Sequence, residues 1–144
     1  MHWSFNSQPL TQIPLFQSGK KLIPAIGFIY HITNTQTNKH YIGKKLFHHK
    51  RNKKTIESDW QSYNGSNKTL LEEIKSNNPI LIKNILHICH SKSQCNYIEA
   101  YYQFKYNVLL SPDYYNDWIS VRVTKKQLQK YATIIESELE NSKK

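Results

Sequence analysis

The feature that constrains the fold most is a pair of strand-like runs on either side of a short polar loop. Residues 27–33 (GFIYHIT) and 39–45 (KHYIGKK) are rich in β-branched and aromatic residues, and residues 35–38 (TQTN) lie between them. Two such runs joined by a four-residue loop predict a β-hairpin. A loop of this length pairs Asn34 with Lys39, which fixes the register of both strands.

That register decides which side chains share a face of the hairpin. Because side chains alternate along a strand, Tyr30, Ile32 and Tyr41 are expected on one face, with the two tyrosines as diagonal neighbours. Gly43 lies opposite Tyr30, and a glycine inside a strand costs stability unless something approaches closely. Two phenols beside this opening could hold a water molecule and a phosphate oxygen. The alternative is that both tyrosines simply pack on a half-buried face.

The remaining elements follow from periodicity and from helix-start signals. We predict a helix at 67–76, a strand at 80–89, a helix at 92–109, a short edge strand at 118–123 and a final helix from Thr124, where Thr124 and Gln127 form a capping box. Residues 1–24 hold three prolines and no clear period, and are expected to form an irregular arm. Residues 25–144 are then a single domain with an α/β fold: a small, mainly antiparallel three-stranded sheet flanked by helices.

The charge balance points to a polyanionic partner. Twenty Lys and Arg stand against ten Asp and Glu, which gives a net charge of +10 and a pI near 9.6. A small domain this basic commonly binds nucleic acid. A membrane surface would attract the same charge, but the chain has no basic amphipathic helix and no apolar run of membrane length. With two cysteines and no signal-peptide pattern, we expect a cytoplasmic protein.

The densest group of cations follows the hairpin. Residues 44–54 hold six cations, which could neutralise phosphates without reading sequence, or could form an ordinary solvated face: Lys44, Lys45, Lys50, Arg51, Lys53 and Lys54. Arg51 differs from its neighbours, since Arg122 is the only other arginine in the chain. A guanidinium can grip two phosphate oxygens, whereas a lysine acts as a point charge.

A glutamate lies on the face of the second predicted helix that turns toward the sheet. Cys95, Ile98, Tyr102, Tyr106 and Leu109 form one stripe at helical spacing, and Glu99 falls inside its edge. A carboxylate in that position is costly unless it is paired or holds a metal ion. The alternative is a glutamate that reaches solvent or pairs with a lysine.

These motifs together resemble the GIY-YIG nucleases. Phe28-Ile29-Tyr30, ten intervening residues and Tyr41-Ile42-Gly43 resemble the family's opening, with Phe28 where a glycine is usual. Arg51 falls eight residues after Gly43, in the region where the family places an essential arginine. Tyr97-Ile98-Glu99 and Tyr114-Tyr115-Asn116 resemble its metal-binding glutamate and its downstream asparagine.

The resemblance implies a metal-dependent DNA endonuclease that acts on a duplex. Its catalytic residues would be Tyr30, Tyr41, Arg51, Glu99 and Asn116, with Glu99 holding one Mg²⁺ or another divalent ion such as Mn²⁺. Tyr30 would activate or position water, and nearby cations would have to lower its pKa if it is to act as a base. The segment Asp59-Trp60-x-x-Tyr63-x-Gly65-Ser66 further resembles the phage-borne branch related to homing endonucleases. This resemblance implies that the cytoplasm is that of a bacterium or of a phage-infected host cell.

Two other interpretations remain open at this point. The charge and the tyrosine content would serve a non-catalytic DNA- or RNA-binding module, or a ribosomal protein, equally well. A zinc site is the second alternative, although its spacing matches no common ligand pattern: His87, Cys89, His90 and Cys95. Convergence of Tyr30, Tyr41, Arg51 and Glu99 on one positively charged surface would favour the nuclease.

Overall fold

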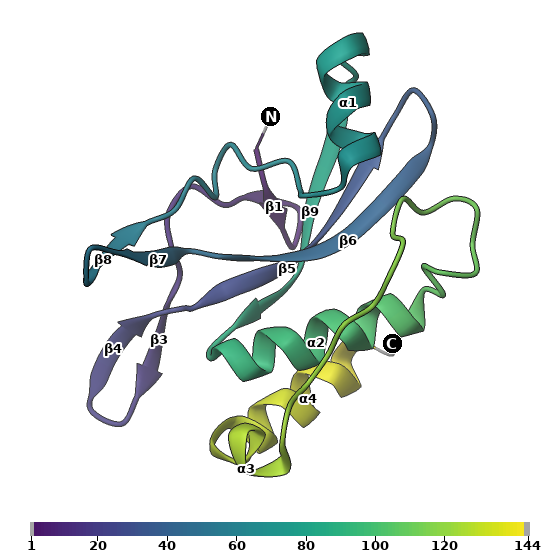
Figure 1. The fold of residues 1–144 in the computed structure, drawn as a ribbon. Helices are drawn as coiled ribbons and strands as arrows, with labels where there is room; N and C mark the ends of the chain where they lie inside the picture. Colours follow the sequence, from purple (N-terminus) through teal and green to yellow (C-terminus); the bar gives the residue numbers. More distant parts are fainter. Residues whose placement is uncertain (1, 143–144) are drawn as a thin grey trace.

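The computed structural model describes residues 2–142, with α/β architecture built on one main sheet (Figure 1). The order of its strands is β2-β1-β9-β5-β6. Their bounds are Ser4–Phe5 for β1, Gln8–Pro9 for β2, Gly27–Asn34 for β5, Lys39–Leu46 for β6 and Leu81–Cys89 for β9. Strand β6 forms one edge of the sheet, and this edge carries the candidate site described below.

The β5–β6 hairpin has the predicted register. Asn34 pairs with Lys39, and Tyr30 lies opposite Gly43. Asn38 adopts a positive φ of 57°, and its N–H donates to the Asn34 carbonyl at 2.8 Å, which closes the turn. Asparagine tolerates this left-handed conformation better than most residues do. Tyr30 and Tyr41 therefore lie on the same face of the hairpin, as the register predicts.

The sheet is larger than the predicted three-stranded one, because residues 4–24 are not irregular. Strand β1 pairs in parallel with β9, and β2 pairs with β1. Trp3 anchors this arm: its side chain is fully buried, and its indole N–H donates to the Trp60 carbonyl at 2.6 Å. Strands of two residues are too short to produce a periodic pattern, so no sequence signal marks β1 and β2.

Three of the helices begin at a residue whose side chain caps the first turn. Helix α1 (Lys68–Asn77) has Asn67 as its N-cap, and α2 (Lys92–Lys105) has Ser91. The expected capping box at Thr124 and Gln127 opens α3 (Lys125–Leu128). The single final helix that we predicted is interrupted by the 3₁₀ turn η1 (Gln129–Tyr131), after which α4 (Ala132–Ser142) continues.

Two further predictions are wrong in the part of the chain from the end of α2 to residue 123. Residues 118–123 form no strand in the described part of the chain; they run as an extended segment along α2. Helix α2 ends at Lys105 rather than at residue 109, which leaves Tyr106 and Leu109 about half exposed. Asn107 adopts a positive φ there, and such a residue stops a helix.

The main sheet carries a separate core on each face. Trp3, Phe28 and Tyr30 belong to the first core, together with Trp60 and Leu70. The second core lies beneath α2 and α4, and its buried members include Ile29, Ile42, Cys95, Ile98 and Tyr102. The tyrosine rings and helix α2 therefore lie on opposite faces of the sheet.

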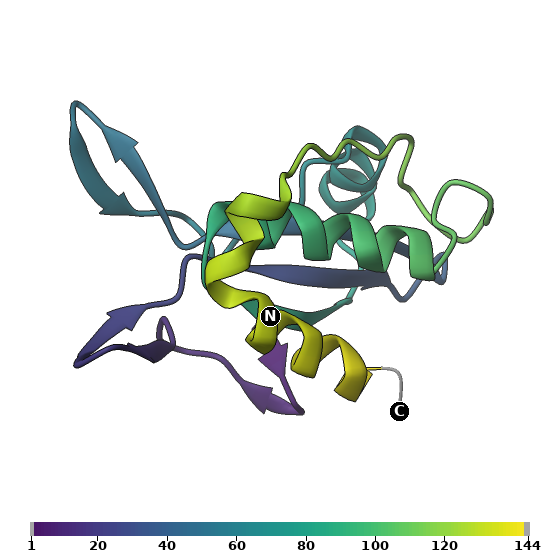
Figure 2. The ribbon, with the colours of Figure 1, turned by 90° about the horizontal axis from the view of Figure 1, so that it is seen from below.

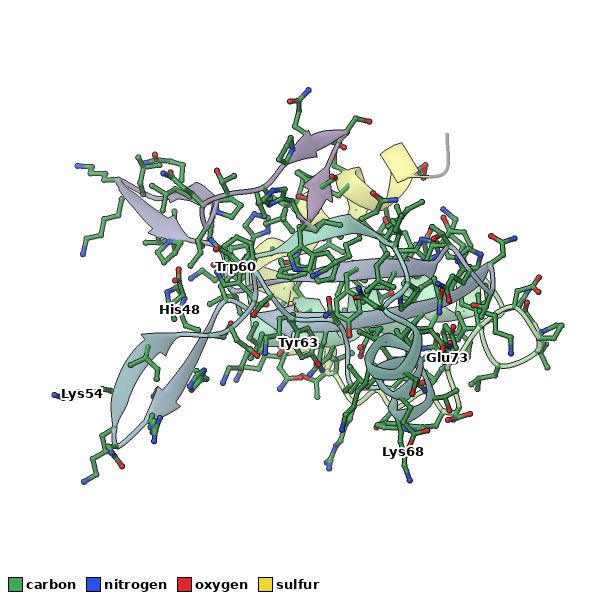
Figure 3. The ribbon with its side chains drawn as sticks, turned by 90° about the horizontal axis from the view of Figure 1, so that it is seen from above. His48, Lys54, Trp60, Tyr63, Lys68 and Glu73 are labelled. Atoms are coloured by element: carbon green, nitrogen blue, oxygen red, sulfur yellow. The ribbon has the colours of Figure 1, made fainter. Side chains whose placement is uncertain are left out.

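Two small hairpins project from the same end of the molecule (Figures 2 and 3). One consists of β3 (Leu15–Ser18) and β4 (Lys21–Pro24), the other of β7 (His48–Arg51) and β8 (Lys54–Glu57). Most side chains of β7 and β8 are exposed. The basic segment predicted from the sequence is thus an exposed two-stranded ribbon.

Candidate active site

A pocket of about 540 Å³ lies at the free edge of β6, where the two faces of the sheet meet. Five parts of the chain build its walls: β5, β6, helix α2, the beginning of α1 and the segment from Asn116 to Ser120. The residues that line it are Tyr30, Tyr41, Gly43, Lys44, Ser66, Asn67, Lys68, Glu99, Gln103, Asn116, Asp117, Trp118 and Ser120. Residues far apart in the sequence are thus gathered around one polar opening.

Tyr30 reaches this opening because Gly43 has no side chain. A Cβ on Gly43 would lie 2.5 Å from the Tyr30 hydroxyl oxygen and 3.1 Å from Cε1 of Tyr41. Real Cβ atoms do not approach so closely, and the Tyr30 ring is itself fully buried in the first core. The space predicted beside Tyr30 is therefore filled by its own phenol, which passes over Gly43 to the edge of the sheet.

Both tyrosines are held as neutral phenols. The pKa of Tyr30 is raised well above its usual value, first by burial and then by the neighbouring phenols of Tyr63 and Tyr41. Burial also raises the pKa of Tyr41, whose hydroxyl lies 3.2 Å from the Ser66 hydroxyl. This corrects the expectation that cations would lower the pKa of Tyr30. The phenols are suited to orienting water and phosphate oxygens by hydrogen bonding.

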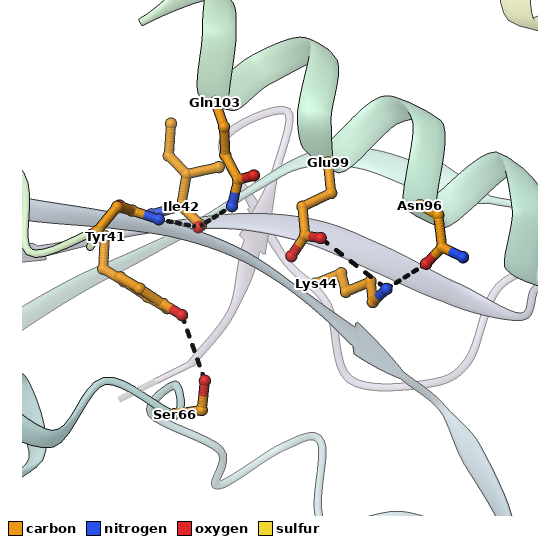
Figure 4. A network of polar contacts seen from close by, with 8 residues as sticks. Tyr41, Ile42, Lys44, Ser66, Asn96, Glu99 and Gln103 are labelled. Carbon is orange, nitrogen blue, oxygen red and sulfur yellow. Dashed lines mark hydrogen bonds and ion pairs between the residues drawn. The ribbon is translucent and has the colours of Figure 1, made fainter. Parts of the chain in front are cut away.

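Glu99 extends from α2 toward the same edge (Figure 4). Its carboxylate lies 3.9 Å from the Lys44 ammonium, which also donates to the Asn96 side chain. Burial raises the pKa of Glu99, although the Lys44 charge and a hydrogen bond with the Lys44 backbone lower it in part. The Glu99 side chain is only 15% exposed, so water solvates it poorly, and one lysine at 3.9 Å compensates only part of its negative charge. Such a carboxylate is suited to a divalent cation.

Asn116 joins the last wall of the pocket to the free edge of β6. Its Nδ2 donates to the Ile42 carbonyl at 2.8 Å, and its Oδ1 accepts from the Ile42 N–H at 3.2 Å. Gln103 of α2 donates to the same carbonyl at 3.0 Å. The side chain of Asn116 thus pairs with the strand as another strand would, and it fixes the segment that follows.

Arg51 lies outside the pocket. It ends β7 at the turn of the exposed hairpin, whereas the resemblance predicted it beside the tyrosines and Glu99. The reason is that β6 continues almost directly into β7 rather than into a helix that would turn back toward the site. Tyr30, Tyr41 and Glu99 converge as predicted, and a catalytic role for Arg51 stays a prediction.

The five lysines of the predicted nucleic-acid surface also divide into separate groups. Lys44 lines the pocket, while Lys45 pairs with Asp59 at 2.7 Å and lies over the Tyr63 ring at 4.0 Å. The other three are exposed on the β7–β8 hairpin: Lys50, Lys53 and Lys54. In Figure 3, Lys54 lies out on the projecting hairpin, whereas Lys68 lies beside the sheet at the beginning of α1.

Sequence reasoning missed several residues of the pocket. Lys68 is the second cation that lines it, and the N-cap residue Asn67 donates to the Tyr115 carbonyl at 3.0 Å, which ties α1 to the opposite wall. Asp117 and Trp118 were assigned no function. The helix start at Asn67 was a readable signal for Lys68, because helix N-termini attract phosphate groups. No local signal marked Trp118.

The four residues of the zinc alternative divide into two pairs, because both histidines contact Gln94 and both cysteines lie in the second core. Cys89 and Cys95 are buried in the second core, His87 contacts Glu138 of α4, and His90 packs against Phe16. The described part of the chain contains no group of three or more His, Cys, Asp or Glu residues that could hold a metal ion.

Comparison with known proteins agrees with the geometry of the pocket. Residues 3–119 match the family model "Putative endonuclease segE, GIY-YIG domain". The chain belongs to the GIY-YIG endonuclease family. No curated protein and no solved structure matches it significantly. The GIY-YIG match includes the N-terminal strands and every residue of the pocket except Ser120, and it indicates a nuclease, hence a hydrolase whose substrate is a nucleic acid. Among residues 2–142, no helix is long and apolar enough to cross a membrane.

Proposed function

We propose that the protein is a metal-dependent DNA endonuclease that hydrolyses phosphodiester bonds at the β6 pocket. The observation that carries this proposal is the meeting of one poorly compensated carboxylate, Glu99, with two phenols and two lysines around one opening. A module that only binds nucleic acid gains nothing from a carboxylate at its phosphate site, because negative charge repels the ligand.

Glu99 is the residue that we propose to hold a divalent ion, Mg²⁺ or Mn²⁺. Mg²⁺ commonly binds through one or two carboxylates and completes its shell with water and substrate phosphate. Glu99 and Asp117 are the two carboxylates that line the pocket, so the donor set fits. When bound, such an ion polarises the phosphate and stabilises the leaving oxygen.

The side chains around Glu99 have complementary tasks in this proposal. Lys68 and the N-terminal N–H groups of α1 attract the scissile phosphate from one wall. The neutral hydroxyls of Tyr30 and Tyr41 orient the attacking water and a phosphate oxygen by hydrogen bonding. Lys44 balances part of the Glu99 charge and contributes positive potential at the phosphate.

The test of this proposal is plasmid cleavage. Purified protein and supercoiled plasmid are incubated with Mg²⁺, with Mn²⁺ and with a chelator, and the nicked and linear products are separated. We expect cleavage only with a divalent ion. If the protein binds the plasmid but does not cleave it with either divalent ion, the alternative function applies: a non-catalytic basic DNA- or RNA-binding module. The net charge of +10 would serve that function equally well.

The β7–β8 hairpin is proposed to hold duplex DNA through its phosphates. Replacing Lys50, Lys53 and Lys54 with Ala should lower the salt dependence of duplex binding by up to about three units of slope, one per lost phosphate contact. The measurement is fluorescence anisotropy of a labelled duplex over a range of salt concentrations. An unchanged slope would show that the hairpin is only a solvated surface.

A matched control removes the same charge from another exposed region. Lys125, Lys126 and Lys130, on α3 and the following turn, are exposed, and their replacement with Ala should leave the slope unchanged. Arg51→Ala belongs to the same series. A variant that weakens binding but cleaves bound DNA at the wild-type rate identifies Arg51 as a binding residue, whereas slow cleavage of fully bound DNA would support a catalytic role.

A further inference from the structure

One wall of the pocket carries an exposed tryptophan that the proposed mechanism does not use. The chain has three tryptophans, of which Trp3 and Trp60 are each 1% exposed in the first core. Trp118 is 72% exposed and lines the pocket together with Glu99 and Lys44. A large apolar ring that is this exposed at the mouth of a polar pocket contributes little to the packing of the fold.

The backbone on both sides of Trp118 is anchored. Asn116 is buried and bound to the Ile42 backbone through both ends of its amide. Ile119 packs against the second core. Only Asp117 and Trp118 lie between these anchors, and both are exposed. The indole is therefore presented to the pocket from a fixed segment rather than from a loose loop.

The pocket suggests what covers this ring. Lys44, Lys68 and the beginning of α1 attract a phosphate group, and a phosphate in a nucleic acid is followed by a sugar and a flat base. Indoles stack on nucleobases of any sequence. In an intact duplex both faces of each base are covered by neighbouring bases, so stacking requires a base that has left the helical stack.

We propose that Trp118 stacks on an unstacked nucleobase beside the phosphodiester held in the pocket. This inference rests on the proposed function and adds a substrate preference to it. DNA with an unpaired base near the cleavage site should bind more tightly than a fully paired duplex. An alternative occupant is a second copy of this chain, because exposed apolar residues such as Phe104 and Val121 line a groove on the neighbouring surface.

The fluorescence of Trp118 provides the test, because the other two indoles are buried. Three labelled duplexes are compared in the presence of a chelator, so that none is cleaved: one fully paired, one with a single bulged base, and one with an abasic bulge. Anisotropy of the label reports binding, and tryptophan emission with its quenching by acrylamide reports stacking. We expect the bulged base to quench the emission most and to protect Trp118 from acrylamide.

Each other outcome has a definite meaning. Saturated binding without a change in emission, or equal quenching by the base and by the abasic bulge, would overturn the stacking proposal and leave the nuclease proposal intact. A failure to bind any of the three duplexes would overturn both. A blue shift of the emission with rising protein concentration, without DNA, would assign Trp118 to a contact between copies and would also overturn stacking.

Substitutions give a second readout. Trp118→Ala should weaken binding of the bulged duplex about 5- to 100-fold, the usual range for loss of one stacked base, and Trp118→Phe should restore most of the affinity. Both should bind the abasic bulge about as well as the wild type. Phe104→Ala removes another exposed aromatic ring, outside the pocket, and should bind all three duplexes as the wild type does. Equal losses in Trp118→Ala for all three duplexes would overturn the proposal.

Discussion

Glu99→Gln is expected to abolish metal-dependent cleavage while the protein still folds and binds DNA. Glutamine keeps the size of the side chain and can still accept from the Lys44 backbone, but it lacks the charge that a divalent ion needs. Loss of a preorganised charge in a transition state typically slows a reaction by about 10²–10³-fold. Single-turnover cleavage of labelled duplex in Mg²⁺ measures this loss, and anisotropy measures binding.

The same substitution is expected to stabilise the fold at neutral pH. Because burial raises the pKa of Glu99, the folded protein favours the protonated carboxyl more than the unfolded chain does. The wild type therefore loses stability as the pH rises from the usual glutamate pKa of about 4.3 through the raised pKa in the folded state. Glu99→Gln carries no such group, so its advantage in melting temperature should shrink as the pH falls through this window.

A control variant separates the carboxylate at the pocket from negative charge in general. Glu72 is exposed on α1, and Glu72→Gln should cleave as the wild type does and show no gain in stability. Wild-type cleavage by Glu99→Gln under Mg²⁺ would show that Glu99 does not hold the ion. Cleavage by the wild type should also decline with acid at a higher pH than an ordinary glutamate would cause, because the protonated carboxyl cannot bind a cation.

Tyr30→Phe is expected to be the second most damaging change, with cleavage slowed by about 10²-fold or more. The substitution removes only a hydroxyl from a ring that is otherwise fixed between Trp3, Tyr41 and Tyr63. The fold should lose no more than about 0.5–1.5 kcal/mol, the usual contribution of one hydrogen bond. Cleavage and thermal melting together separate the chemical effect from the structural one.

Tyr63→Phe is the matched control, because it breaks the same hydrogen bond between the two phenols from the side that lies outside the pocket. It should cleave nearly as fast as the wild type. If Tyr30→Phe and Tyr63→Phe lose activity equally, the loss comes from breaking the hydrogen bond between the two phenols. It would then not come from removing the Tyr30 hydroxyl from the pocket.

Gly43→Ala tests the position of that hydroxyl while keeping the phenol itself. The new methyl would lie 2.5 Å from the Tyr30 oxygen, so the ring must shift. Overpacking of this kind costs typically about 1–3 kcal/mol. Cleavage should fall even where the protein remains folded, and full activity in a folded Gly43→Ala variant would contradict the proposed role of Tyr30.

The sequence by itself determined the features that depend on neighbouring residues. The length of the loop set the register of β5 and β6, and strand alternation placed Tyr30 and Tyr41 on one face beside Gly43. The spacing of apolar residues located α1 and α2, and the capping box at Thr124 located the start of α3. Helical spacing also identified Glu99 as the exceptional carboxylate of α2. These features depend on residues close together in the sequence, which repeat every two residues in a strand and every 3.6 residues in a helix. They can therefore be read from a single sequence.

The tertiary structure alone decided what these residues meet. Burial of Trp3 beside Trp60 brought the N-terminal arm into the sheet, although nothing near Trp3 in the sequence signals this contact. The continuation of β6 into β7 carried Arg51 away from the pocket, and the Asn116 contacts with Ile42 carried Trp118 into it. Burial also raised the pKa of Tyr30 where nearby lysines suggested the opposite. The burial of a side chain, and the meeting of several side chains at one pocket, depend on many contacts between residues that are distant in the sequence. A local sequence pattern does not encode those contacts.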